Sequence, residues 1–190
     1  MSLSQTFIIQ GNARLSGELI VDGNKNAALP LIAASILSPG PVLLKRIPQI
    51  LDVLHMCEVL VQMGADVTIP EPDSLLINTS NLDPTRINRR AWEAIRAAIL
   101  FVAPIVSRFG KIVFPTPGGD VIGRRRLDSH FLAFKEMGAE IDAHNGEFSV
   151  IAPASGLRSA QIFLDEASVT GTENALMAAA AVMPLVVPPC

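Results

Sequence analysis

The sequence predicts an α/β domain made of repeated units, with buried helices at its centre and small sheets outside them. One observation behind this prediction is a Met-Gly-Ala-acid-aliphatic motif, which occurs within residues 59–67 and again within residues 133–141. Its glycines, Gly64 and Gly138, lie 74 residues apart. In both copies a helical pattern ends at Met-Gly, where glycine can adopt the left-handed conformation that closes a helix, and an alternating, strand-like pattern follows.

The other observation is an alanine-rich helical segment that occurs three times. Its equivalent positions are Asn26, Arg96 and Asn174, which are separated by 70 and 78 residues. Such regular periods indicate three copies of one αβ unit. Residues 94–106 are apolar on nearly all sides of a helix, so this helix must be buried on most sides. We therefore expect the helices to form the centre of the domain.

Short apolar segments between Gly, Pro, Asn and Ser turns predict the strands. We expect strands at residues 6–9, 18–21, 42–45, 75–78, 111–114, 149–152 and 160–163. Neither a dinucleotide-binding glycine pattern nor a P-loop accompanies them.

Composition excludes several classes of protein. The chain has 190 residues, 49% of them hydrophobic, which is enough for a sizeable core. Its net charge of −3 gives no general attraction for nucleic acid, so we expect no nucleic-acid partner, and no protein partner is predicted. The longest apolar run, residues 175–190, contains three prolines and is shorter than the roughly 20 residues of a membrane helix. We therefore expect no association with a membrane.

Cysteine usage and the N-terminus indicate the compartment. Cys57 and Cys190 cannot build a disulfide framework, and Cys57 lies in a helical pattern rich in Val, Leu and Met, which favours a core thiol over a nucleophile. The first ten residues lack the basic start and apolar run of a signal peptide. The expected location is the cytoplasm.

The most informative motif is P-G-G-D-V-I-G-R-R-R-L-D at residues 117–128. Its glycines allow the backbone to turn and to approach a ligand closely. Arginine binds phosphate and carboxylate groups bidentately, and Asp120 among these arginines could exchange a proton with a bound anion. The alternative is a surface turn followed by a solvated basic run.

Beyond these patterns, segments along almost the whole chain resemble the enolpyruvyl transferases. They are D-G-N-K-N-A-A-L-P-L-I-A-A-S-I-L, R-I-P-Q-I-L-D-V, I-R-A-A-I-L, R-F-G-K-I-V-F-P-T-P-G-G-D-V-I-G-R-R-R-L-D-S-H and L-D-E-A-S-V-T-G-T-E-N. The resemblance implies an inside-out α/β barrel domain of repeated αβ units around buried central helices. It also implies transfer of the enolpyruvyl group of phosphoenolpyruvate to the 3-hydroxyl of UDP-N-acetylglucosamine, the first committed step of peptidoglycan synthesis, with release of phosphate. Neither a metal nor an organic cofactor is implied.

The resemblance assigns roles to the residues nearest the reaction. Asp120 would be the proton donor, and Lys25 and Arg125 would hold phosphoenolpyruvate. Asn26 and Arg96 would contact the sugar nucleotide. The structural alternatives are a solvated helix start for Lys25, an ion pair within the repeat for Arg96 and a turn-forming aspartate for Asp120.

Two further groups of residues would bind the nucleotide. One is the stretch that cradles uracil and diphosphate, formed by Arg126, Leu127, Asp128 and Ser129. The other is a diphosphate-binding turn before a helix, formed by Ser168, Val169, Thr170 and Gly171, for which the alternative is an ordinary N-cap. Family members usually have proline at the position of Arg126, so the backbone course there is an open question.

Asp120 departs from most of the family, which has cysteine at this position. An aspartate has a reference pKa near 3.9, so it needs its pKa raised to donate a proton at neutral pH. The neighbouring arginines oppose that change, whereas a bound anionic phosphoenolpyruvate favours it, and we hypothesise that protonation is coupled to substrate binding. Because a carboxylate is a weaker nucleophile than a thiolate, an enzyme with Asp120 is also expected to resist the epoxide fosfomycin.

The resemblance further implies a chain about twice this length, with an active site between two domains. We expect residues 1–21 to belong to a largely missing first domain, residues 22–183 to form a domain of three repeats with the third incomplete, and residues 184–190 to be an aberrant tail from a frameshift or truncation. Such a chain is expected to be inactive alone. Two alternatives stay open: a non-catalytic sugar-nucleotide-binding half-protein or pseudogene product, and a transferase that uses shikimate phosphate.

Overall fold

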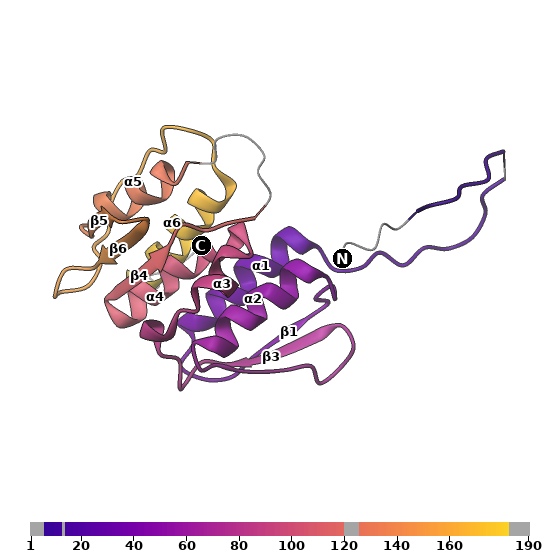
Figure 1. Ribbon diagram of the computed structural model, residues 1–190, viewed down its shortest axis with the longest axis horizontal. Helices are drawn as coiled ribbons and strands as arrows, with labels where there is room; N and C mark the ends of the chain where they lie inside the picture. The colour runs from indigo at the N-terminus through magenta and orange to yellow at the C-terminus, as the bar shows by residue number, and fades with distance from the viewer. Residues whose placement is uncertain (1–5, 13, 120–125, 183–190) are drawn as a thin grey trace, which may run out of the picture.

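Helices lie between two small antiparallel sheets in the computed structural model, which describes residues 6–12, 14–119 and 126–182 (Figure 1). The first unit contains α1 (Lys25–Ala34), the 3-10 helix η1 (Ser35–Leu37), β1 (Val42–Lys45), α2 (Leu51–Gln62), β2 (Asp66–Thr68) and β3 (Ser74–Asn78). The second contains η2 (Pro84–Arg86), α3 (Arg89–Glu93), η3 (Arg96–Phe101), α4 (Val102–Phe109), β4 (Lys111–Pro115), α5 (Asp128–Glu136), β5 (Glu140–His144) and β6 (Glu147–Ile151). The helix α6 (Val169–Val182) follows.

The two units repeat the same topology. Their strand orders are β1-β3-β2 and β4-β6-β5, so in each sheet the last strand along the chain pairs between the other two. Gly64 and Gly138, with φ of 95° and 93°, end α2 and α5, the helices that precede the last two strands of each unit. In both, the next residue donates a backbone hydrogen bond five residues back, from Ala65 to Leu60 at 3.0 Å and from Ala139 to Phe134 at 2.9 Å. This pattern is the Schellman motif, and it confirms the predicted helix-to-strand hinge.

The alanine-rich helices form the core, as predicted. Every residue from Ala97 to Val106 in η3 and α4 is buried. Trp92 on α3 packs against Phe101 and Phe114, with ring centroids 6.2 Å and 5.4 Å away. Small alanine side chains let the helices approach closely, while the sheets cover them from outside.

Three predicted strands are wrong. Residues 6–9, 18–21 and 160–163 have no strand structure, although their apolar patterns match those of real strands. Ile8 is 96% exposed, Ile20 86% and Phe163 88%, so these segments contact little of the described protein. A strand needs a neighbour to pair its backbone N–H and C=O groups, and the described residues supply none here. Residues 6–12 and 14–21 instead lie away from the domain (Figure 1).

Two further findings apply to the described part of the chain alone. Within it, no helix is both long enough and apolar enough to cross a membrane. No group of three His, Cys, Asp or Glu side chains suited to a metal ion gathers in these same residues.

Burial raises the pKa of the Cys57 thiol to about 11, so it is a poor nucleophile at neutral pH, in line with the expected core thiol.

Candidate functional site

The start of η3 and the start of α5 enclose a cavity of about 400 Å³ with charged walls. Arg96 Nη2 donates a hydrogen bond of 3.2 Å to the backbone oxygen of Arg126. Arg126 in turn forms an ion pair with the carboxylate of Asp128. The structure therefore brings four predicted site residues together, and it adds three that the sequence did not indicate. The lining consists of Arg96, Thr116, Arg126, Leu127, Asp128, Phe131 and Phe148.

Two glycines fix where the chain enters the segment that carries Asp120. A Cβ added to Gly118 would lie 1.7 Å from the backbone oxygen of Glu93, so no larger residue fits without movement. Gly119 has a φ of 88°, and a Cβ there would lie 3.0 Å from the backbone nitrogen of Arg96. The glycine pair thus packs directly against the turn between α3 and η3. Asp120 and Arg125, the predicted proton donor and phosphoenolpyruvate ligand, lie outside the described residues.

A buried polar network joins α5, α6 and the central helix. Asn174 accepts a hydrogen bond from the backbone N–H of Ala103 at 3.2 Å and donates one to the backbone oxygen of Ile99 at 3.0 Å. Its amide nitrogen also lies 2.8 Å from His130 Nδ1. Because an amide nitrogen only donates, Nδ1 must accept, and the ring proton is on Nε2, which donates to Thr170 Oγ1 at 3.2 Å.

The environment of His130 keeps its ring neutral. Burial, and then the nearby charge of Arg96, lower its pKa from 6.5 to about 4. A neutral ring satisfies the hydrogen bonds to Asn174 and Thr170, whereas a second ring proton would face the amide hydrogens of Asn174. His130 is therefore a structural link next to the cavity. The pattern of the sequence did not predict this role, and Asn174 stood out only as a marker of the repeat.

The predicted diphosphate turn lies at the N-terminus of α6. Ser168 Oγ accepts a hydrogen bond from the backbone N–H of Gly171 at 3.1 Å, which is the N-cap geometry named as the alternative. Ser129 Oγ is fully buried and has no hydrogen-bond partner in the described part of the chain. A Cβ on Gly171 would lie 2.8 Å from this oxygen. The structure thus brings Ser129 to the turn with Ser168, Thr170 and Gly171, while Val169 is 72% exposed.

Lys25 and Asn26 begin α1. Lys25 Nζ forms an ion pair of 2.8 Å with Asp52 Oδ2, in the first turn of α2. Asn26 is exposed, and the helix is capped by Asn24, which accepts from the backbone N–H of Ala27 at 3.1 Å. In the described residues, no hydrogen bond or ion pair joins Lys25 or Asn26 to the arginine cavity. Asp52 is a neighbour that the sequence did not reveal.

Comparison with known proteins identifies the family. Residues 9–184 match the family model of EPSP synthase (3-phosphoshikimate 1-carboxyvinyltransferase). The chain belongs to this family of enolpyruvyl transferases. The family name describes a carboxyvinyl transfer, in agreement with the resemblance of the sequence.

Curated relatives are similar over nearly the whole chain. The UDP-N-acetylglucosamine 1-carboxyvinyltransferase of Treponema denticola is 49% identical over 91% of this chain and 40% of its own length. The proteins of the same name from Borrelia garinii and Porphyromonas gingivalis are 43% and 41% identical, over 40% and 41% of their own lengths. The chain thus spans about two fifths of these relatives, as expected for an N-terminal half.

Solved structures confirm the fold. The enolpyruvyl transferase NikO from Streptomyces tendae superposes with a TM-score of 0.71 at 17% identity, over 88% of this chain and 39% of that one. EPSP synthase from Acinetobacter baumannii superposes with a TM-score of 0.63 at 18% identity, over 85% and 37%. The chain therefore has part of the enolpyruvyl transferase fold.

Proposed function

We propose that this chain carries substrate-binding residues of a UDP-N-acetylglucosamine 1-carboxyvinyltransferase, which transfers the enolpyruvyl group of phosphoenolpyruvate to the 3-hydroxyl of the sugar. The observation that carries the proposal is the 41–49% identity, over more than nine tenths of this chain, to relatives of that name. The arginine cavity supports it because both substrates are anions. The reaction belongs in the cytoplasm at the start of cell-wall peptidoglycan synthesis, and the proposal includes no cofactor.

The chemistry requires a proton donor and a positively charged pocket. The 3-hydroxyl oxygen forms a bond to C2 of phosphoenolpyruvate and loses its proton, which leaves on the departing phosphate, while C3 gains a proton for which Asp120 is the proposed donor. Loss of a proton from C3 and of phosphate from C2 then restores the double bond, so that the products are the enolpyruvyl ether and inorganic phosphate. Asp120 follows Gly119 in the chain, and Gly119 packs against Arg96.

Cations at the cavity suit the phosphate and carboxylate groups. Arg96 and Arg126 present guanidinium groups to the same space. Lys25 and Arg125 are proposed to bind phosphoenolpyruvate, and Asn26 the sugar nucleotide. In this proposal the Lys25–Asp52 ion pair opens or is shared when the substrate binds, which an exposed pair permits at little cost.

The start of α6 suits a diphosphate. Free backbone N–H groups in the first turn of a helix favour anions, and Ser168, Val169, Thr170 and Gly171 form this turn. The hydroxyl of Ser129 beside Gly171, which has no hydrogen-bond partner among the residues that the structure describes, supports a polar ligand near this point. Leu127 and Asp128, at the cavity, are proposed to contact the uracil and diphosphate.

A second candidate acceptor is shikimate 3-phosphate, which the description of the matching family model favours. The identities favour UDP-N-acetylglucosamine, since relatives that are 41–49% identical carry its name. A third candidate is a non-catalytic half-protein or pseudogene product that at most binds the sugar nucleotide, because the chain covers about 40% of its relatives.

Isothermal titration calorimetry with UDP-N-acetylglucosamine and, separately, shikimate 3-phosphate tests the acceptor. We expect UDP-N-acetylglucosamine to give heat of binding and shikimate 3-phosphate to give none. Arg96→Met should weaken it about tenfold, because a charged hydrogen bond to phosphate is lost, whereas Arg14→Met, in the exposed N-terminal segment, should leave it unchanged. Binding of shikimate 3-phosphate alone would overturn the proposed acceptor.

A coupled assay for phosphate release then tests whether the chain acts by itself. We expect no turnover from the 190-residue chain with both substrates. Measurable turnover that is lost in Asp120→Ala would show an active chain and exclude the non-catalytic alternative.

A further inference from the structure

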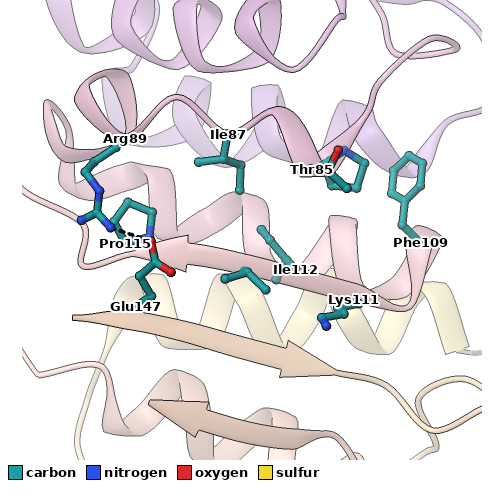
Figure 2. A pocket seen from close by; sticks show the side chains of 10 residues that line it. Thr85, Ile87, Arg89, Phe109, Lys111, Ile112, Pro115 and Glu147 are labelled. Carbon is teal, nitrogen blue, oxygen red and sulfur yellow. Dashed lines mark hydrogen bonds and ion pairs between the residues drawn. The ribbon is translucent and has the colours of Figure 1, made fainter. Parts of the chain in front are cut away.

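A second cavity, of about 640 Å³, lies between β4 and residues 84–89 (Figure 2). Apolar side chains form most of its wall, among them Ile87, Phe109 and Val113. The ion pair of Arg89 and Glu147 lies at one end, and Thr85 and Phe109 lie at the other (Figure 2). A concave, mostly apolar site with a few polar groups, in the range of about 300–1,000 Å³, is typical of small-molecule binding.

One wall of this cavity is the open edge of a sheet. The backbone of Gly110 accepts from Ala152 at 2.8 Å and that of Thr116 donates to Gly146 at 3.3 Å, so even-numbered residues pair toward β6. The backbone groups of Lys111 and Val113 therefore point away from β6, toward the open edge. In the described part of the chain, no backbone hydrogen bond joins β4 to residues 84–89. The edge thus offers free donors and acceptors to a ligand.

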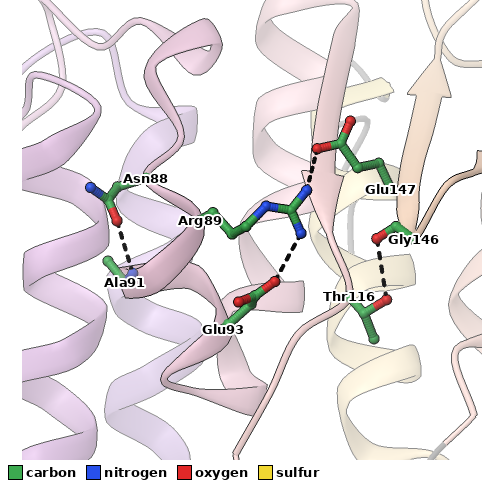
Figure 3. Close-up of polar contacts among 7 residues, drawn as sticks. All are labelled: Asn88, Arg89, Ala91, Glu93, Thr116, Gly146 and Glu147. Atoms are coloured by element: carbon green, nitrogen blue, oxygen red, sulfur yellow. Dashed lines mark hydrogen bonds and ion pairs between the residues drawn. The ribbon is translucent and has the colours of Figure 1, made fainter.

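The two cations at the cavity, Arg89 and Lys111, differ in their ion pairs. Arg89 is held by two carboxylates, with Glu93 at 2.9 Å and Glu147 at 2.5 Å (Figure 3). Lys111 is exposed and has no ion pair with any residue that the structure describes. Because Arg89 is already neutralised, Lys111 is the charge that an incoming anion would meet.

This cavity is distinct from the arginine cavity. Pro115 and Glu147 line it, while the next residues, Thr116 and Phe148, line the other. Successive residues of a strand point to opposite faces, so the paired ends of β4 and β6 separate the two spaces. No lining residue is shared between them.

We propose that the cavity between β4 and residues 84–89 binds a small molecule with an apolar body and one carboxylate. The body packs against Ile87, Phe109 and Val113, and the carboxylate pairs with Lys111. The proposal does not depend on the transferase function, since it uses none of the residues assigned to the reaction.

Titration of the full chain with 4-phenylbutyrate, and with the neutral 4-phenylbutan-1-ol as its control, tests the proposal. We expect the acid to bind more tightly than the alcohol. Lys111→Met should weaken the acid about fivefold, the size expected for an exposed ion pair, and leave the alcohol unchanged. Val113→Trp should weaken both by filling the space. Lys135→Met, an exposed lysine on α5, is the matched control and should change neither.

Amide chemical shifts, measured by NMR during the same titration, locate the probe. We expect changes at residues 84–89 and 109–115, and none at Arg96 or Leu127. The proposal is wrong if neither compound binds, if Lys111→Met and Lys135→Met act alike, or if the changes centre on Arg96. A loss of amide dispersion in an unliganded variant would reveal a failure to fold, and Lys111→Ala or Val113→Phe would then replace that variant.

Discussion

At the scale of single residues, Gly118 and Gly119 show how the absence of a side chain positions a functional segment. Both glycines lie against the backbone of the α3–η3 turn, which carries Arg96. Contact between two backbones leaves no flexible atom to move aside. The glycines therefore serve packing at least as much as the loop flexibility that the sequence indicated.

We predict that Gly118→Ala destabilises the protein by about 2 kcal/mol or more, because its Cβ would overlap the backbone oxygen of Glu93 at 1.7 Å. Gly40→Ala is the control, since a Cβ there has nothing within 4 Å and φ is not positive. That change should be neutral or slightly stabilising. Urea unfolding followed by circular dichroism measures both, and equal free energies of unfolding for the two variants would contradict the packing argument.

The structure brings several of the predicted residues together, but the sequence could not supply their partners. Arg96, Arg126, Leu127 and Asp128 meet at one cavity. Lys25, however, pairs with Asp52, 27 positions away, and nothing in the local pattern encodes a contact that the packing of α1 on α2 creates. The buried hydrogen bonds of Asn174 escaped prediction for the same reason.

At the scale of elements, a structure could be predicted where one segment contains everything that forms it. The two helix ends at Met-Gly were predictable, because the Schellman motif needs only local residues and a glycine. The strands at residues 6–9, 18–21 and 160–163 were not, because pairing depends on a neighbour that the segment does not contain. Alternation of apolar residues is necessary for a half-buried strand but does not create its partner.

The two helix ends should respond differently to the same change. Gly64→Ala and Gly138→Ala both place a Cβ at positive φ, which costs about 1–2 kcal/mol. At Gly64 the Cβ would also lie 2.9 Å from the backbone oxygen of Asn81, whereas at Gly138 it would meet the flexible side chain of Arg158 at 3.2 Å. We therefore expect Gly64→Ala to lower the free energy of unfolding more. Urea unfolding of both variants checks this, and the reverse order would show that the contact with Asn81 relaxes freely.

The link between α5 and α6 should make stability depend on pH. The pKa of His130 is lowered to about 4 in the folded protein, so between pH 6.5 and 4 the unfolded chain binds a proton that the folded chain does not. Above pH 6.5 the neutral His130 ring causes no loss of stability. As the pH falls from 6.5 toward 4, the free energy of unfolding decreases by about 3 kcal/mol in all. Unfolding in urea at a series of pH values measures this loss.

A matched pair of variants isolates His130 from the other titrating groups. His130→Gln keeps one acceptor and one donor but cannot take up a proton, so its stability should fall less steeply between pH 6.5 and 4. His144→Gln, at an exposed position, should keep the full slope. If all three proteins lose stability in parallel, His130 does not titrate in the way that its burial implies.

At the scale of the whole molecule, stability resides in the helices and the two sheets. Of the residues that the structure describes between positions 6 and 21, every one is exposed, including Phe7, Ile8 and Leu19. Apolar side chains that remain in water contribute no burial energy. This part of the chain therefore adds length and apolar surface to the molecule without adding to its core.

We predict that deletion of residues 1–20 changes the free energy of unfolding by less than about 0.5 kcal/mol, the range of substitutions that remove no contact. Deletion of residues 176–190 is the comparison, because it removes Met177 and Ala178, which are 8% and 0% exposed and pack into the core. That shorter deletion should cost about 2–5 kcal/mol, as for other losses of buried apolar side chains. Urea unfolding of both shortened proteins and of the full chain measures the two costs. If the N-terminal deletion were the more costly, residues 6–12 and 14–20 would have to pack on the domain, in contradiction of their exposure.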